Sequence, residues 1–336
     1  MSNKFIIVGV DDGHSETKIV MPNGSKFRMP SNATSGKQNI ISINDSSDDK
    51  KDVVEYKTNS GSFIAGNIQK PDPTNFNDYP ISTLNRVIVN HALYSAGIKD
   101  GSKVKICTGL PLKRFYVKGQ PNKKLIKSKI DNLLNNDVSS VDADFSIEVL
   151  DHRVFSEGVA AWIDHIVTRG SDGKLDIDSE LLKRKIAVID MGGRTLDVAV
   201  VSDWKLDADR SGTFDIGMLS IRNSIAEEIY NDHEVELNED QMNDVLVNKK
   251  FRLYGRDMDA DIYIKEAEQK VVNTAKAQIM RLLGKAADID KVLFVGGTSC
   301  YLEPYIDKWF PHQVMVKDAA FANARGFQKF MELTQG

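Results

Sequence analysis

Alternating blocks of apolar and polar residues predict a chain of strands and helices in a repeated order. The apolar run at residues 5–10 predicts a buried strand. Residues 17–20 and 26–29 predict two more strands, because the turn sequence at residues 22–24 favours an antiparallel hairpin. The chain therefore begins with a meander whose first connection, residues 11–16, is short.

A second unit near residue 185 repeats this order. Apolar runs at residues 186–189 and 196–201 predict strands on either side of a glycine loop, and residues 204–213 continue the pattern. An aspartate ends the first strand each time, Asp11 in one unit and Asp190 in the other. Because an internal duplication is a stronger signal than either copy alone, we predict an α/β fold with two similar domains.

The remaining periodic segments complete this outline. We expect helices at residues 81–96, 122–134, 157–167, 218–230, 239–247, 261–283 and 319–333. Further strands are predicted at residues 53–56, 62–65, 104–108, 292–295 and 313–316. The first domain is placed at residues 1–170, with a polar inserted subdomain at 31–79 and the closing helix 319–336 returning to it; the second domain is placed at residues 171–318.

Composition limits the classes of function. The 336 residues are 41% apolar and 27% charged, which is typical of globular proteins. Lys and Arg total 44 and Asp and Glu 48, a balance that argues against direct gripping of DNA phosphates and favours an adaptor for any work on DNA. The apolar run at residues 5–10 is too short for a signal peptide, and no stretch approaches the ~20 apolar residues of a membrane span. We expect a cytoplasmic protein.

Neither cysteines nor histidines predict a metal site. Cys107 and Cys300 each end an apolar segment without a Cys or His at metal spacing, so we expect two buried, reduced thiols. The six histidines are scattered and are interpreted as structural or surface residues. The closing helix has an apolar side with few basic residues, which favours packing against the fold over membrane binding.

Candidate phosphate chemistry begins at residues 11–18. A tight connection containing Gly13 and Ser15 can point backbone N–H groups at phosphate oxygens. Asp11 can hold Mg²⁺ through water, because Mg²⁺ retains most of its waters, and the Lys18 ammonium can reach a phosphate. An ordinary hairpin with a solvated tip accounts for these residues equally well when the segment is taken alone.

Two later glycine segments strengthen the phosphate interpretation. Gly192 and Gly193 follow Asp190 directly, and glycines allow the backbone to approach a ligand that a Cβ would block. The alternative is a tight β-turn, but the repetition of the first loop favours a functional role. Residues 295–299 combine a strand, two glycines and a helix start, as in many nucleotide sites, although the third glycine of the dinucleotide fingerprint is missing.

Glu157 is the candidate catalytic carboxylate. It precedes small and apolar residues of a predicted helix and could orient water for attack on a γ-phosphate. Complementing the positive end of a helix is the simpler explanation for this residue taken alone.

In this order the motifs resemble those of the actin and sugar-kinase superfamily, over essentially the whole chain. The resemblance implies an actin-like, ribonuclease H-like fold in which two domains close over ATP and Mg²⁺ in a cleft. It implies catalytic roles for Glu157 and Asp190, and Mg²⁺ held through water by Asp11 and Asp190. The nucleotide-binding residues it implies are Asp11, Gly13, Ser15, Thr17, Lys18, Gly192, Gly193, Arg194, Thr195, Gly217, Gly296, Gly297 and Thr298.

The finer resemblance is to the ParM/StbA family of plasmid partition. Residues 107–112, 190–197 and 322–326 are similar to segments of that family, whereas His14 and Arg194 replace small or polar loop residues. The resemblance implies ATP-dependent polymerisation into a filament, with no membrane partner. A ParR-type adaptor bound to the centromere would hold the filament end, so that plasmid DNA is contacted only indirectly.

Several alternatives stay open from sequence. A DnaK-type chaperone would carry a further peptide-binding domain, and a small-molecule kinase would need a substrate pocket. A chromosomal or phage actin-like cytoskeletal protein shares the same core, and nucleotide could serve structure alone. The preference between ATP and GTP is also open. We expect the polar insertion at residues 31–79 to contact a neighbouring subunit.

Overall fold

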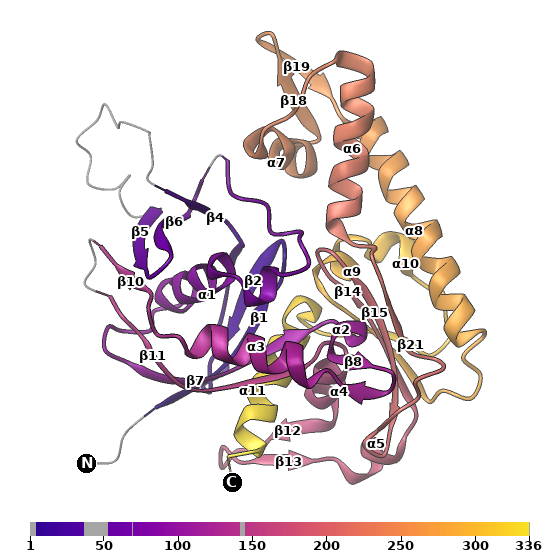
Figure 1. Ribbon diagram of the computed structural model, residues 1–336. Coiled ribbons are helices and arrows are strands. Elements are labelled where there is room, and N and C mark those ends of the chain that lie inside the picture. Colours follow the sequence, from indigo (N-terminus) through magenta and orange to yellow (C-terminus); the bar gives the residue numbers. More distant parts are fainter. Residues whose placement is uncertain (1–4, 37–52, 69, 142–144, 336) are drawn as a thin grey trace.

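The computed structural model describes residues 5–36, 53–68, 70–141 and 145–335. Two main sheets with helices packed on them form two halves of the chain, which stand side by side in Figure 1. This is the α/β architecture that the repeated pattern predicts. The most polar part of the insertion, residues 46–51, lies outside the described residues.

The sheet of the first half contains strands β1 (Ile6–Asp12), β2 (Glu16–Val20), β3 (Lys26–Pro30), β7 (Lys103–Leu110) and β11 (Glu148–Ser156). Within the described residues its order is β11-β7-β1-β2-β3. The first three strands in the chain form the antiparallel meander, and β7 and β11 extend the sheet in parallel with β1. The first hairpin loop is therefore held at the end of a central strand.

Smaller elements complete the first half. They are β4 (Ala33–Ser35), β5 (Val53–Thr58), β6 (Gly61–Gly66), η2 (Tyr79–Ile81), α1 (Thr83–Ser95), α2 (Leu112–Phe115), β8 (Tyr116–Val117), β9 (Gln120–Pro121), α3 (Lys123–Leu134) and β10 (Ser139–Ser140). In the described part of the chain, β10, β5, β6 and β4 form a separate small sheet. Its apolar face packs against α1, which also contacts β2, so this subdomain is anchored beside the first hairpin.

The second half repeats the meander. Its strands are β14 (Ile186–Met191), β15 (Leu196–Ser202), β16 (Lys205–Leu206), β17 (Gly212–Phe214), β20 (Lys291–Val295) and β21 (Gln313–Met315). β14 pairs antiparallel with β15 and parallel with β20, as β1 does with β2 and β7. Asp11 lies opposite Lys18 in the first hairpin, and Asp190 lies opposite Asp197 in the second. The repeat predicted from sequence is present strand by strand.

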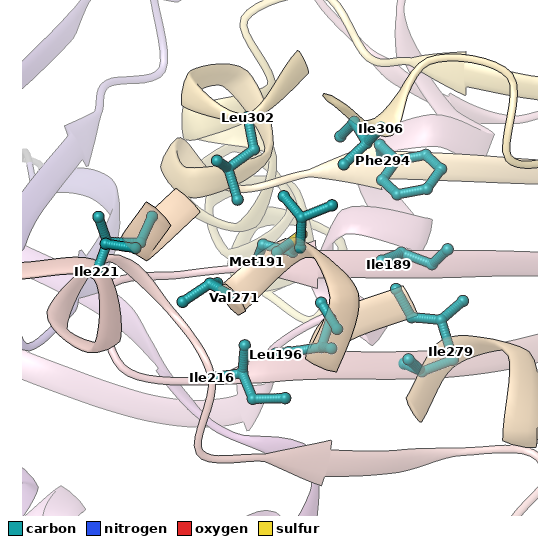
Figure 2. Packing of buried hydrophobic residues seen from close by; sticks show 14 of the residues in the cluster. Ile189, Met191, Leu196, Ile216, Ile221, Val271, Ile279, Phe294, Leu302 and Ile306 are labelled. Carbon is teal, nitrogen blue, oxygen red and sulfur yellow. The ribbon is translucent and has the colours of Figure 1, made fainter. Parts of the chain in front are cut away.

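Long helices cover one face of the second sheet. These and the adjoining elements are α6 (Met218–His233), α7 (Glu239–Asn248), β18 (Lys250–Leu253), β19 (Arg256–Asp259), α8 (Asp261–Leu283), α9 (Gly297–Tyr301) and α10 (Glu303–Ile306). Figure 2 shows how side chains from the strands and these helices interdigitate, with Leu196, Ile221 and Val271 among them. This buried cluster fixes the position of the second hairpin loop.

The last helix packs against the first half. After η3 (Ala319–Phe321), helix α11 (Ala322–Leu333) contacts β1, β7 and α4 (Val159–Ile166), and it lies beside these elements in Figure 1. Glycines allow this approach, because a Cβ on Gly9 would overlap the carbonyl of Ala324 and one on Gly326 would overlap that of Ala160. The segment between α4 and β14 forms β12 (Val167–Arg169), β13 (Leu175–Ile177) and α5 (Ser179–Lys183).

Two of the differences from the sequence-based expectations concern strand β11 and Cys300. Strand β11 was not predicted, because its charged residues conceal the alternation of buried Val149, His152 and Val154 and a bulge interrupts the pairing after Val149. Cys107 is buried as expected, but the expectation for Cys300 is wrong, because it lies exposed after two buried residues of the short helix α9. In the part of the chain that the structure describes, no helix has the length and apolar character needed to cross a membrane.

Buried histidines predict a loss of stability in acid. Burial lowers the pKa of His91 to about 4 and that of His152 to about 3. Both values lie below the ordinary value of about 6.5, so the unfolded chain binds more protons across this window and acid favours unfolding. The free energy of unfolding should fall by up to ~1.4 kcal/mol per pH unit for each histidine as the pH drops from about 6.5 towards 4.

Urea unfolding at pH 7 and pH 5 measures this effect. The variants His91→Gln and His152→Gln should each reduce the difference in stability between the two pH values. Equal pH dependence in both variants and the unaltered protein would contradict the assignment.

Candidate functional site

The two hairpin loops meet at the junction of the halves. The β1–β2 loop carries Ser15 and the β14–β15 loop carries Gly193; a Cβ on Gly193 would overlap Ser15 Oγ and lie 2.8 Å from Ser15 Cβ. Only glycine permits this approach. Among the described residues, the buried hydroxyl of Ser15 finds no hydrogen-bond partner. A buried polar atom without a protein partner between two loops is a feature expected where a ligand binds.

Ser31, which directly follows β3, stabilises the first loop through hydrogen bonds to its carbonyl groups. The N–H of Ser31 donates to Ser15 O at 2.9 Å, and its hydroxyl donates to Gly13 O at 2.7 Å. Thr17 Oγ1 lies 2.9 Å from Ser31 Oγ and is fully buried, so the Thr17 side chain supports the loop from behind.

Lys18 and Asp11 form a cross-strand pair beside this loop. Lys18 Nζ lies 3.4 Å from Asp11 Oδ2 and 3.7 Å from Glu16 Oε2. Burial alone would lower the pKa of Lys18, but the carboxylates of Asp11 and Glu16 outweigh it and the pKa is raised. Lys18 therefore keeps its charge in a buried position, as a phosphate-neutralising group must.

The second loop is fixed by the start of α6. Gly192 N–H donates to Thr195 O at 2.8 Å, which closes the turn, and Gly193 O accepts from Leu219 N–H at 2.8 Å. A Cβ on Gly217 would lie only 2.5 Å from the carbonyl oxygens of Gly192 and Gly193. Gly192 and Gly217 thus shape the turn and its contact with the helix, while the amide of Gly192 is already occupied.

The third glycine segment reaches the second loop. Gly296 has a φ of +92°, and a Cβ there would lie 2.5 Å from Asp190 Oδ1. Thr298 Oγ1 donates to Gly192 O at 2.7 Å. Gly297 lies nearer the first hairpin, where an added Cβ would meet Glu16 Oε2 at 3.8 Å. The structure therefore brings all three predicted segments together.

Glu157 reaches the same region from β11. Its backbone N–H donates to Leu110 O at 2.9 Å, and its side chain packs over Gly109, where an added Cβ would lie 2.9 Å from Glu157 Oε1. Burial, then the charges of Asp197, Asp11 and Asp190, raise the pKa of this carboxyl well above its usual range.

The pKa values of the neighbouring carboxyl groups are raised as well. Burial, with the charge of Asp197, raises the pKa of Asp190 to about 7, although a hydrogen bond from Asn323 opposes the shift. Burial raises the pKa of Asp197 to about 6, and the pKa of Asp11 is also raised, chiefly by burial. Carboxylates crowded in this way favour a cationic ligand, because a positive charge relieves their repulsion.

The carboxylates of the site fit a hydrated Mg²⁺ better than a metal ion coordinated by protein side chains alone. Within the described residues, no group of three or more His, Cys, Asp or Glu side chains could hold a metal ion. Mg²⁺ is often bound through one or two carboxylates while it keeps several waters. Asp11 and Asp190 at the ends of equivalent strands fit that pattern.

Several residues of the site were not singled out from sequence. Asp197 accepts from Leu112 N–H at 2.8 Å and from the hydroxyls of Thr195 and Thr213, so it ties β15 to α2. Asn323 contacts Asp190 from α11 at 2.6 Å. These partners lie far apart in the chain, and nothing local in the sequence marks them; for Asp197, its place opposite Asp190 in the repeated hairpin was the available signal.

Asp12, adjacent to the predicted Asp11, has a structural role. Lys129 Nζ lies 2.8 Å from Asp12 Oδ2, and Asn85 Nδ2 donates to the same oxygen at 2.8 Å. Both charged side chains are buried, so this pair anchors α3 and α1 to the end of β1.

Arg194 and His14 point towards the segment before η2. Arg194 donates to Asn75 O and Asn77 Oδ1, each at 3.2 Å, and His14 Nδ1 lies 2.6 Å from Thr74 O. Burial lowers the pKa of His14 to about 4. A hollow of about 360 Å³ beside them is lined by His14, Asn77, Pro111, Lys113, Arg114, Arg194, Thr195, Thr213 and Asp215. Arg194 thus lines this hollow.

Comparisons with known proteins match two parts of the chain to family models. Residues 6–166 match the family model described as the N-terminal region of the plasmid segregation protein ParM. Residues 188–308 match that of the C-terminal region of archaeal MreB-like actin homologues. A search of curated proteins finds no significant match.

Solved structures show the same fold. A 15-stranded ParM filament from Clostridium botulinum is 21% identical with a TM-score of 0.78, covering 98% of this chain and 99% of that one. The archaeal actin homologue Ta0583 is 18% identical with a TM-score of 0.75, covering 98% and 100%. Its complex with ADP is 19% identical with a TM-score of 0.74, again covering 98% and 100%. The predicted actin-like two-domain fold is confirmed.

The contact between β17 and α2 offers a test of how the site is held. Thr213 Oγ1 donates to Asp197 and accepts from Lys113 N–H at 2.9 Å. Thr213→Val keeps the shape but removes one donor to Asp197 and leaves the Lys113 N–H without its acceptor, so the free energy of unfolding should fall by about 1–3 kcal/mol. Thr213→Ser retains the hydroxyl and is the matched control. Urea unfolding that shows equal stability for both variants would refute this role of the hydroxyl.

Proposed function

Because the chain has the fold of ParM and of the archaeal actin homologues, and its two parts match family models of these proteins over residues 6–166 and 188–308, we propose that it is a cytoplasmic ATPase whose polymerisation moves plasmid copies apart. The observation that carries this proposal is the contact of the two hairpin loops around the unpaired hydroxyl of Ser15. A nucleotide phosphate supplies the hydrogen-bond partner that this buried group lacks.

The nucleotide's phosphates bind where the loops meet. Ser15, with the backbone of Gly13 and Gly193, donates hydrogen bonds to phosphate oxygens, and Lys18 exchanges its contact with Asp11 for one with a phosphate. Gly192 keeps the turn in shape and is not itself a donor, because its N–H is bonded to Thr195. The adenosine lies along Gly296, Gly297 and Thr298.

Hydrolysis needs an oriented water and a neutralised phosphate charge. Asp11 and Asp190 are the carboxylates that would hold a hydrated Mg²⁺ at the junction. When bound, Mg²⁺ neutralises the charge that develops on the transferred phosphoryl group. Glu157 holds the attacking water, and the nearby cation favours its ionised form against the burial that raises its pKa.

Polymerisation would couple this chemistry to movement. Subunits with bound ATP add to a filament, and hydrolysis then destabilises it. The likeness to a ParM filament supports self-assembly. A ParR-type adaptor on the centromere holds the filament end, so growth between two plasmid copies pushes them apart; the formal charge of −4 is consistent with DNA bound through the adaptor.

Substitutions in the site separate binding from hydrolysis. Asp190→Ala should abolish ATP turnover. Glu157→Gln should still bind ATP and polymerise but hydrolyse it about 10²- to 10⁴-fold more slowly, because the water loses its base. Phosphate release measures both effects. The control variant is Glu148→Gln, at the exposed first residue of β11, the strand that leads into Glu157. It should leave turnover unchanged. Unaltered phosphate release by Asp190→Ala would refute the role of Asp190.

Light scattering with parallel phosphate release tests the function as a whole. On addition of Mg-ATP, scattering should rise quickly and then decay as phosphate is released. Phosphate release without any rise in scattering would contradict the filament and favour a small-molecule kinase, in which case phosphate acceptors should accelerate turnover. Neither signal with ATP or GTP would overturn the proposal.

A further inference from the structure

A single side-chain amide joins two distant parts of the candidate site. Asn323 Nδ2 donates to Asp190 Oδ2 at 2.6 Å, and its Oδ1 accepts from Gly158 N–H at 3.1 Å. Only 7% of Asn323 is exposed, so water has little access to replace either bond. Asp190 is the penultimate residue of β14, and Gly158 directly follows Glu157. The amide therefore connects the metal-side carboxylate to the backbone that carries Glu157.

The backbone at Gly158 needs such support. Its φ of 71° and ψ of −50° place it in a tight three-residue turn, closed by Val159 N–H donating to Glu157 O at 2.8 Å. Turns of this form are rare and strained, and such strain persists only where the surroundings impose it. Glycine tolerates the positive φ, and Asn323 supplies the acceptor for its buried N–H.

The amide can serve both partners in one orientation only. Its NH₂ group must face the carboxylate and its oxygen must face the backbone N–H. The flipped amide would place its oxygen against the carboxylate and its NH₂ group against the N–H, and neither pair can form a hydrogen bond. An aspartate of the same size offers acceptors alone. Asparagine at this position thus satisfies a carboxylate and a strained turn together.

The link also crosses between the halves. Asn323 is near the start of α11, which packs against β1 and β7 of the first sheet, whereas Asp190 belongs to the second sheet. We propose that Asn323 is a positioning residue, which fixes Asp190 and the turn that follows Glu157 relative to each other. The water-orienting carboxylate and the metal-organising carboxylate can then act together. This inference rests on the proposed ATPase function.

Two substitutions test this role. Asn323→Ala removes both bonds, and Asn323→Asp keeps the acceptor for Gly158 but sets a carboxylate against Asp190. Loss of such a supporting partner typically costs about 10- to 100-fold in activity or metal affinity, so kcat should fall by that factor in both variants. The strengthening of ADP binding by Mg²⁺ relative to EDTA, measured by fluorescent-nucleotide displacement, should shrink by a similar factor.

The control is a similarly buried amide outside the site. Asn132 is 8% exposed, donates to Ser82 O at 3.0 Å and accepts from Arg86. Asn132→Ala should lose stability and yet keep kcat and the Mg²⁺ effect on ADP binding. If Asn323→Ala does not fold, Asn323→Asp is judged by the same readouts.

The outcomes separate this inference from the function on which it rests. Asn323 variants that lose stability like Asn132→Ala but retain kcat and the Mg²⁺ effect would show a merely structural residue and overturn the inference, leaving the ATPase intact. A wild-type protein that does not hydrolyse ATP would overturn both.

Discussion

The close contact of Ser15 with Gly193 is the constraint on which the site depends. The second loop cannot retreat from the first, because the carbonyls of Gly192 and Gly193 are bonded to the first amides of α6 and packed against Gly217. Helix α6 is in turn held by the buried cluster of the second half, part of which Figure 2 shows. The position of this loop backbone is thus determined by core packing, and small changes there have little room to be absorbed.

Crowded carboxylates make the site costly without its ligand. Asp11, Asp190, Asp197 and Glu157 share a buried region, and the pKa of each is raised chiefly by burial. Lys18 offsets part of this charge. A fold that keeps such a cluster gives up stability, as functional sites commonly do, and recovers it when a ligand binds only the folded state. The same crowding of carboxylates that costs stability therefore favours a nearby positive charge.

Much of this arrangement could be predicted from local sequence. The strands that carry Asp11 and Asp190 as their penultimate residues have clear apolar runs, and their glycine loops follow at once. Strand β11 could not be predicted, because an edge strand carries charged residues on its open side. The partnership of Lys129 with Asp12 was equally hidden, since a lysine-rich helix such as α3 indicates only a solvated surface until the fold places one lysine inside.

The halves are joined in two physically different ways. Apolar side chains of α4, such as Trp162, pack against Val188 and Leu293 of the second sheet. Beside the loops the joins are polar, through Asn323 with Asp190 and Arg194 with Asn77. Apolar contacts are non-directional and tolerate small shifts, whereas hydrogen bonds weaken steeply once they are misaligned. A rotation of one half against the other would therefore disrupt the polar joins first, which makes the region around the loops the part of the interface most sensitive to such a rotation.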